Sequence, residues 1–98
     1  MTLTKQQEGP NLTVFAEGRL DTTTAPQLDE LLKTSLDGVT QLTLDFSRLA
    51  YVSSAGLRVI LSTQKLMSKK GKLVVRNVQE AVRDVFEVTG FSNILTIE

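Results

Sequence analysis

"QLTLDFSRLAYVSSAGLRVIL", residues 41–61, contains the change in apolar spacing that decides the fold. Leu42, Leu44 and Phe46 alternate with other residues, which is typical of a strand with one buried face. From Ser54 onward the spacing becomes helical. We assign to the core the helix face that carries Gly56, Val59, Ile60, Thr63, Leu66 and Met67. The stretch therefore predicts a strand that leads into a helix, with two serines at the junction.

Strand patterns also occur before and after this unit. An extended segment buries Leu12, Val14 and Ala16 on one side, and the turn sequence EGPN separates it from a short strand near Leu3. This arrangement predicts an N-terminal hairpin. The sequence KLVVR predicts a further short strand, and NILTIE predicts a last strand at the edge of the sheet.

Two more helices are predicted from apolar spacing and from end signals. The apolar face of the first consists of Leu28, Leu31, Leu32 and Leu36, and that of the last consists of Val78, Ala81, Val82, Val85 and Phe86. Capping-box spacing is found at Thr24 with Gln27 and at Asn77 with Glu80. The three helices are expected to end near Gly38, Gly71 and Gly90.

The resulting order, β-β-α-β-α-β-α-β, indicates an α/β fold in one domain that covers residues 1–98. We expect a single small sheet of four to five strands, mainly parallel after the N-terminal hairpin, with three main helices. A chain of 98 residues can form one compact core, and no linker or repeat divides it.

Composition excludes several classes of function. Lys plus Arg and Asp plus Glu each number 11, so the chain lacks the positive field of nucleic-acid and anionic-membrane binders. There is no Cys and no His, which removes the usual zinc sites, Cys nucleophiles and His-based triads. No apolar run is long enough to span a membrane. We therefore expect a cytoplasmic protein with no metal, no cofactor and no catalytic residues.

Polar residues follow two of the predicted parallel strands. Asp21 and the threonines 22–24 come after one strand, and Ser53 and Ser54 come after another. Because the carboxyl ends of parallel strands meet at one edge of a sheet, these side chains should lie on the same rim.

The residues by themselves leave the role of the serines open. A serine at a helix start is a preferred N-cap, and an exposed one could instead be a phosphorylation site. A nucleophilic serine is disfavoured, because the sequence offers neither a histidine base nor a G-x-S-x-G elbow. The polar stripe of the following helix consists of Arg58, Ser62, Lys65 and Lys69, bordered by Leu57 and Leu61. This stripe is either a solvated face or a partner surface.

Two motifs resemble a known family. "EGRLDTTTAPQLDELL" followed by "LDFSRLAYVSSAGLRVIL" resembles the STAS domain anti-sigma factor antagonists of bacteria, over nearly the whole chain in element order and length. The resemblance implies a non-catalytic α/β domain that binds an anti-sigma factor and thereby frees a sigma factor. In that family the anti-sigma factor is often a serine kinase that phosphorylates the antagonist, and a serine phosphatase reverses the modification.

Residue by residue, the resemblance implies that Ser54 is the phosphoacceptor, with Ser53 as the second choice. It also implies a docking surface, for which we select Asp21, Thr22, Ser53, Leu57, Arg58 and Leu61. Many phosphorylated members have Asp where this chain has Ser53. Other members are never phosphorylated and serve as scaffolds or as subunits of transport systems, so a scaffold or accessory subunit is the alternative function.

Overall fold

The computed structural model describes residues 1–98 as one five-stranded sheet with helices. The strands are β1 (Thr2–Glu8), β2 (Asn11–Leu20), β3 (Gln41–Val52), β4 (Lys72–Arg76) and β5 (Thr96–Ile97). The helices are α1 (Ala25–Ser35), α2 (Ser54–Met67), α3 (Glu80–Thr89) and the short 3-10 helix η1 (Phe91–Asn93). The predicted order of elements is confirmed.

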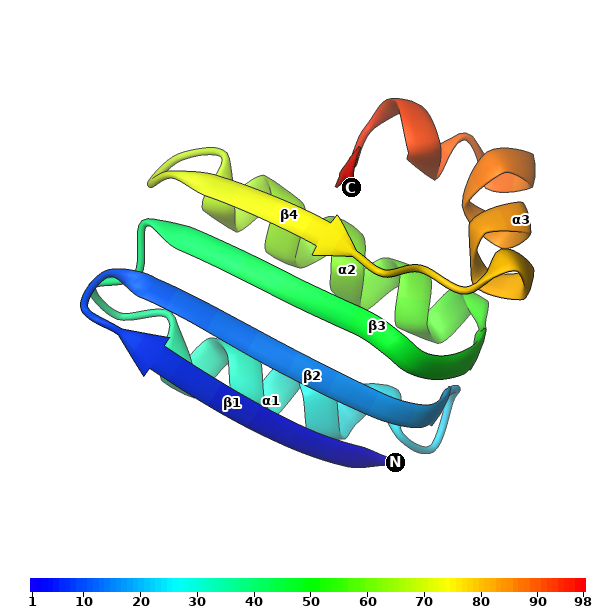
Figure 1. Cartoon of the computed structure of the whole chain (residues 1–98), viewed down its shortest axis with the longest axis horizontal. Helices are drawn as coiled ribbons and strands as arrows, with labels where there is room; N and C mark the ends of the chain where they lie inside the picture. Colours follow the sequence, from blue (N-terminus) through cyan, green and yellow to red (C-terminus); the bar gives the residue numbers. More distant parts are fainter.

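The strands lie in the order β1-β2-β3-β4-β5, and only β1 and β2 pair antiparallel. The other three pairs are parallel, as the connecting helices predict. Figure 1 shows α1 and α2 side by side behind the sheet, and α3 beyond the ends of β3 and β4. The face of the sheet toward the viewer carries no helix, so the core lies between the sheet and α1 and α2.

The predicted strand faces form this core. Leu12, Val14 and Ala16 of β2 are each 1% exposed, and Leu42 and Leu44 of β3 are fully buried. The helices contribute their predicted residues, among them Leu28, Leu32, Ile60, Met67, Val82 and Phe86. The hydrophobic effect of this one cluster is the main force that holds the sheet to its helices.

Two side chains of the predicted helix faces lie outside the core. Leu66 is 45% exposed and Ala81 is exposed, whereas their neighbours Met67 and Val82 are fully buried. Each lies at the edge of its helix face, one residue before a buried residue. The helical spacing alone does not reveal how wide a stripe the sheet covers, and the predicted face was too wide at these two positions.

The predictions of capping boxes at the starts of α1 and α3 were wrong. The Thr24 hydroxyl donates to the Arg19 carbonyl oxygen at 2.8 Å and accepts from the Asp21 amide at 2.8 Å, so it closes the turn before α1 and does not cap it. Asn77 has φ of 58°, and its side chain donates to Asp45 and not to α3. In both cases a contact outside the helix satisfies the side chain that the local pattern assigned to the cap.

Strand β3 is longer than predicted. The alternation that predicted it ends at Phe46, whereas the strand continues to Val52, with irregular pairing against β2 between Phe15 and Glu17 and between Gly18 and Arg19. Helix α2 ends at Met67, four residues before Gly71. A Cβ atom at Gly71 would lie 1.8 Å from the Thr40 carbonyl oxygen, so this glycine permits a close backbone approach.

Candidate functional site

The ends of β2 and β3 lie side by side. Leu20 pairs with Val52, and the Ser53 amide donates to the Leu20 carbonyl oxygen at 2.8 Å. Asp21 and Ser53, the next residues along each strand, therefore start from adjacent positions on one rim. This confirms the expectation that the polar segments after the two strands meet at one edge of the sheet.

Ser53 is the N-cap of α2. Its backbone is extended, with φ of −99° and ψ of 176°, and its hydroxyl oxygen accepts a long hydrogen bond from the Gly56 amide at 3.5 Å. The Ser53 carbonyl oxygen accepts from the Leu57 amide at 2.9 Å, which is the first bond of the helix. The side chain is half-buried. One of the two serines thus has a structural role that is sufficient to explain it.

Ser54 is the first residue of α2 and is exposed. Its hydroxyl makes no hydrogen bond within the protein, whereas its carbonyl oxygen accepts from the Arg58 Nε at 3.4 Å. A second protein can therefore reach this hydroxyl without disturbing the cap. The free amides of the first turn and the positive end of the helix dipole also favour negative charge at this position.

Asp21 organises the turn that faces the serines. Its Oδ1 accepts from the Thr23 hydroxyl at 2.8 Å and from the amides of Thr23 and Thr24 at 3.0 and 3.1 Å. The hydrogen bond from the Thr23 hydroxyl, together with those from Thr24 and the Thr23 amide, lowers the pKa of Asp21 below its ordinary value, although partial desolvation opposes the shift. Asp21 is therefore an ionised carboxylate on the rim. Thr22 lies exposed in the same turn.

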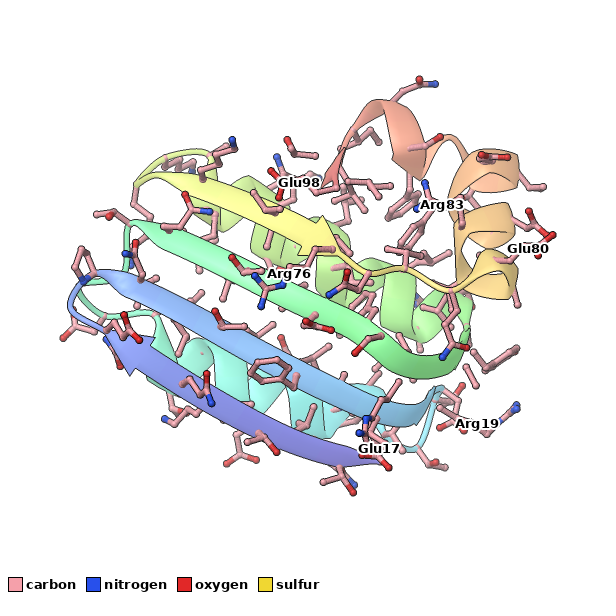
Figure 2. The ribbon with its side chains drawn as sticks, in the orientation of Figure 1. Glu17, Arg19, Arg76, Glu80, Arg83 and Glu98 are labelled. Carbon is pink, nitrogen blue, oxygen red and sulfur yellow. The ribbon has the colours of Figure 1, made fainter.

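Two residues that the sequence reasoning missed extend the rim along the strands. The Arg19 guanidinium lies 4.1 Å from the centre of the Tyr51 ring, and its Nε lies 3.9 Å from the Asp21 Oδ2. Figure 2 shows Arg19 at the end of β2. Tyr51 is 39% exposed. Both residues stand two positions before a predicted site residue, so the two-residue alternation of a strand could have identified them.

The residues of the predicted docking surface differ in exposure. Arg58 is exposed and Leu61 is half-buried, so both remain available for contact. Leu57 was predicted to belong to the docking surface, but it is only 8% exposed and is part of the core cluster. It follows the buried Gly56 in the first turn of α2, where the helix lies close against β2 and β3, and this packing leaves little of Leu57 for a partner.

No group of three or more His, Cys, Asp or Glu side chains could hold a metal ion. A hollow of about 310 Å³ lies on the uncovered face of the sheet, between β1, β2 and β3, and contains none of the predicted site residues. None of the helices has the length and apolar character needed to cross a bilayer.

Asp45 lies beside this hollow and is buried. Its Oδ2 accepts from the Arg76 Nε at 3.1 Å and from the Asn77 side chain at 3.0 Å, and its Oδ1 accepts from the Ser47 amide at 2.9 Å. Burial by itself would raise the pKa of Asp45, but the hydrogen bonds outweigh it and lower the pKa below its ordinary value. This carboxylate joins β3 to β4 and has no oxygen left without a donor.

Known proteins with similar sequences align with nearly the whole length of this chain. BtrV of Bordetella bronchiseptica, a candidate anti-sigma factor antagonist, is 37% identical over 99 residues, which cover 99% of this chain and 85% of BtrV. The anti-sigma-B factor antagonist of Listeria monocytogenes is 29% identical over 97 residues, which cover 96% of this chain and 84% of that protein.

Solved structures show the same fold. The anti-sigma factor antagonist SpoIIAA in its unphosphorylated form has a TM-score of 0.85 at 20% identity, covering 99% of this chain and 88% of SpoIIAA. The phosphorylated form of SpoIIAA, from Bacillus, has a TM-score of 0.77 at 19% identity, covering 99% of this chain and 91% of that one.

A family model described as "Mlab, STAS domain" matches residues 3–96. This match and the relative that is 37% identical to the chain confirm the resemblance that the two sequence motifs carry. The chain belongs to the STAS domain family.

Proposed function

We propose that this protein is an anti-sigma factor antagonist, a non-catalytic binding module that docks on an anti-sigma factor through the rim around Ser54. Phosphorylation of Ser54 blocks the docking. The observation that carries the proposal is that the two serines differ in their contacts. The Ser53 hydroxyl caps α2, whereas the Ser54 hydroxyl is exposed and makes no hydrogen bond within the protein. The relatives named as anti-sigma factor antagonists support the same function.

The docking surface consists of groups that reach solvent around the junction of β2, β3 and α2. It comprises Asp21, Thr22, Ser53, Ser54, Arg58 and Leu61, extended along the strands by Arg19 and Tyr51. Arg and Tyr are enriched among residues that contribute most to binding energy. The surface also contains both a carboxylate and guanidinium groups, which gives a partner charges of both signs to match.

The modification is a phosphoryl transfer. The γ-phosphoryl group of a nucleoside triphosphate bound by the partner kinase forms a bond to the Ser54 Oγ, the hydroxyl loses its proton, and the nucleoside diphosphate leaves. A serine phosphatase reverses the step by hydrolysis and releases inorganic phosphate. SpoIIAA is known in phosphorylated and unphosphorylated forms, which supports the assignment of a reversible modification in this family.

Phosphorylation would change the interface and not the fold. The phosphate carries about −1.5 to −2 charges at pH 7, and a helix N-terminus tolerates negative charge. Pressed against an apolar or acidic partner surface, the same dianion costs several kcal/mol, and each 1.4 kcal/mol weakens binding about tenfold. A single modification can therefore separate the two proteins while both remain folded.

The test begins with capture of the partner from the native cells, together with the intact mass of the bait. Binding of the captured anti-sigma factor is then measured for wild type, Ser54→Ala and Ser54→Asp. We expect Ser54→Asp to bind at least about tenfold more weakly and Ser54→Ala to bind normally without accepting phosphate. Gln7→Glu is the matched control. Gln7 pairs with Leu12 at the other end of β2, so this substitution adds one negative charge far from the rim.

Equal binding by Ser54→Asp and wild type would contradict the proposal, as would phosphate uptake by Ser54→Ala. The alternative is a scaffold or accessory subunit that is never phosphorylated. It is favoured by the presence of Ser53 where many phosphorylated members have Asp. An unmodified intact mass in cells, with a partner that binds Ser54→Asp normally, would support that alternative.

A further inference from the structure

Arg58 lies one helical turn after Ser54 and has no acidic partner. Its Nε donates to the Ser54 carbonyl oxygen at 3.4 Å, and the side chain is exposed. The four ion pairs of the structure join Arg19 to Asp21, Lys33 to Asp29, Arg48 to Glu17 and Arg76 to Asp45. Helix α2 contains no Asp or Glu at any position. Beside Ser54 there is therefore a guanidinium group that no carboxylate neutralises.

We propose that the phosphate on Ser54, once formed, binds the Arg58 guanidinium of the same helix. Residues four apart on a helix are neighbours, and an anion placed N-terminal to a cation is the favoured order. Of the five N–H donors of Arg58, the bond to the Ser54 carbonyl uses one. The others are free for phosphate oxygens, and the planar guanidinium suits them in a bidentate arrangement. The inference rests on the proposed function in that Ser54 is the modified residue.

The same geometry distinguishes Ser54 from Ser53 as the site of such a pair. Ser53 is five residues before Arg58, and its hydroxyl oxygen accepts the capping bond from the Gly56 amide. A phosphate there would have to displace the cap before it could approach the guanidinium. Of the two serines at the start of α2, only Ser54 combines a free hydroxyl with a cation four residues further along the helix.

The pair changes how phosphorylation would act on the docking surface. Arg58 is one of the exposed groups that a partner can contact. When its guanidinium binds the phosphate, the surface gains a dianion and at the same time loses a cation that was available to the partner. The switch would therefore act through two changes at one place, and both follow from a single phosphoryl transfer.

The test requires neither kinase nor partner. Phosphoserine is incorporated at position 54 during translation with an expanded genetic code, and the phosphate is titrated by phosphorus-31 NMR in the full chain. We expect the second pKa of the phosphate to be about 0.5 unit lower in the otherwise native protein than in Arg58→Gln. Arg58→Lys should fall between them, because it keeps the charge but loses the bidentate geometry. Asp21 and Arg19, the charged groups of the facing strand end, are the same in all variants.

Lys65→Gln is the matched control, because it removes one positive charge from the same helix about two turns further on. It should leave the phosphate pKa near that of the phosphorylated parent protein. A second measurement follows the Arg58 Nε–H resonance at one pH, which should shift when position 54 carries phosphoserine in place of serine.

The proposal is overturned if Arg58→Gln titrates like the phosphorylated parent protein, or if Lys65→Gln shifts the pKa as much as Arg58→Gln does. Because phosphoserine is placed genetically, failure of the partner-binding test would not alter this titration. Conversely, a titration without a shift would leave the binding test of Ser54→Asp intact. The two proposals can therefore fail separately.

Discussion

The Ser53 amide donates to the Leu20 carbonyl oxygen at 2.8 Å, one residue beyond the last paired position of β2 and β3. This bond holds the start of α2 against the end of β2. It also gives Ser53 two anchors, one through its backbone and one through the cap to Gly56. The adjacent Ser54 has no comparable restraint on its side chain, and this contrast leads to the first prediction.

Replacing each serine by alanine should affect stability differently. Ser53→Ala removes the N-cap and should lower the free energy of unfolding by about 1 kcal/mol. Ser54→Ala removes an exposed hydroxyl without a partner and should change it by less than about 0.5 kcal/mol. Urea denaturation followed by circular dichroism measures both. If Ser54→Ala were the more destabilising of the two, the assignment of the cap to Ser53 would be wrong.

Added Cβ atoms at two glycines should destabilise the fold through close packing. At Gly56 the new atom would lie 2.6 Å from the Leu20 Cγ and 3.0 Å from the Val52 Cγ2, and we expect Gly56→Ala to cost about 1–3 kcal/mol. At Gly71 it would lie 1.8 Å from the Thr40 carbonyl oxygen, where the backbone itself must move, so Gly71→Ala should cost about 3 kcal/mol or more.

Thermal and urea denaturation would rank these variants, with Gly9→Ala as a control. Gly9 has φ of +60° and nothing within 4 Å of an added Cβ, so its cost should be the backbone strain alone, about 1–2 kcal/mol. A smaller effect at Gly71 than at Gly9 would contradict the close approach of Gly71 to Thr40, the residues that precede β4 and β3.

Because of Asp45, the free energy of unfolding should decrease at acidic pH. Its hydrogen bonds lower its pKa in the folded state, below the ordinary 3.8 that applies to the unfolded chain. The stabilisation is therefore complete above about pH 4 and is lost as the pH falls through the folded pKa. At pH 7 Asp45→Asn should cost about 1–3 kcal/mol, because the amide presents an N–H₂ group among the donors of Arg76, Asn77 and Ser47.

Urea denaturation at pH 7 and at a series of pH values below 4 measures this contribution. The loss of stability between these conditions should be smaller in Asp45→Asn than in wild type. Asp84→Asn, at an exposed position of α3, is the control and should change stability at pH 7 by less than about 0.5 kcal/mol. Equal acid sensitivity of wild type and Asp45→Asn would rule out the role assigned to this carboxylate.

Leu66 and Met67 test the width of the buried face of α2. Met67 is fully buried, so Met67→Ala should cost about 2–5 kcal/mol through lost contacts and the cavity left behind. Leu66 is 45% exposed, and Leu66→Gln should cost less than about 0.5 kcal/mol. Comparable losses for the two variants, measured by urea denaturation, would mean that the core extends over Leu66 as the helical spacing predicted.

Patterns repeated along an element predicted most of the fold. The alternation at Leu12, Val14 and Ala16 identified a strand and its buried face, because residues two apart on a strand point to the same side. The change to helical spacing after Ser53 correctly predicted the residue at which α2 begins. These signals succeed because several residues carry each of them.

Local end signals were less reliable. Thr24 with Gln27 and Asn77 with Glu80 have the spacing of capping boxes, yet Thr24 bonds to the Arg19 carbonyl and Asn77 bonds to Asp45. Asn77 is 32 residues from Asp45 along the chain. Nothing in the local sequence reports that such a partner exists, so the choice between cap and tertiary contact lies beyond a local pattern.

The sequence by itself determined the order of strands and helices, the rim on which Asp21 and the two serines meet, and the family motifs that surround them. Only the tertiary structure decided which serine caps α2, that Leu57 is buried, and that Arg19 lies over Tyr51. The physical reason is that the two kinds of property arise at different levels of structure. Periodicity is set by the geometry of a single element, whereas exposure and side-chain partners depend on segments that come together only when the chain folds.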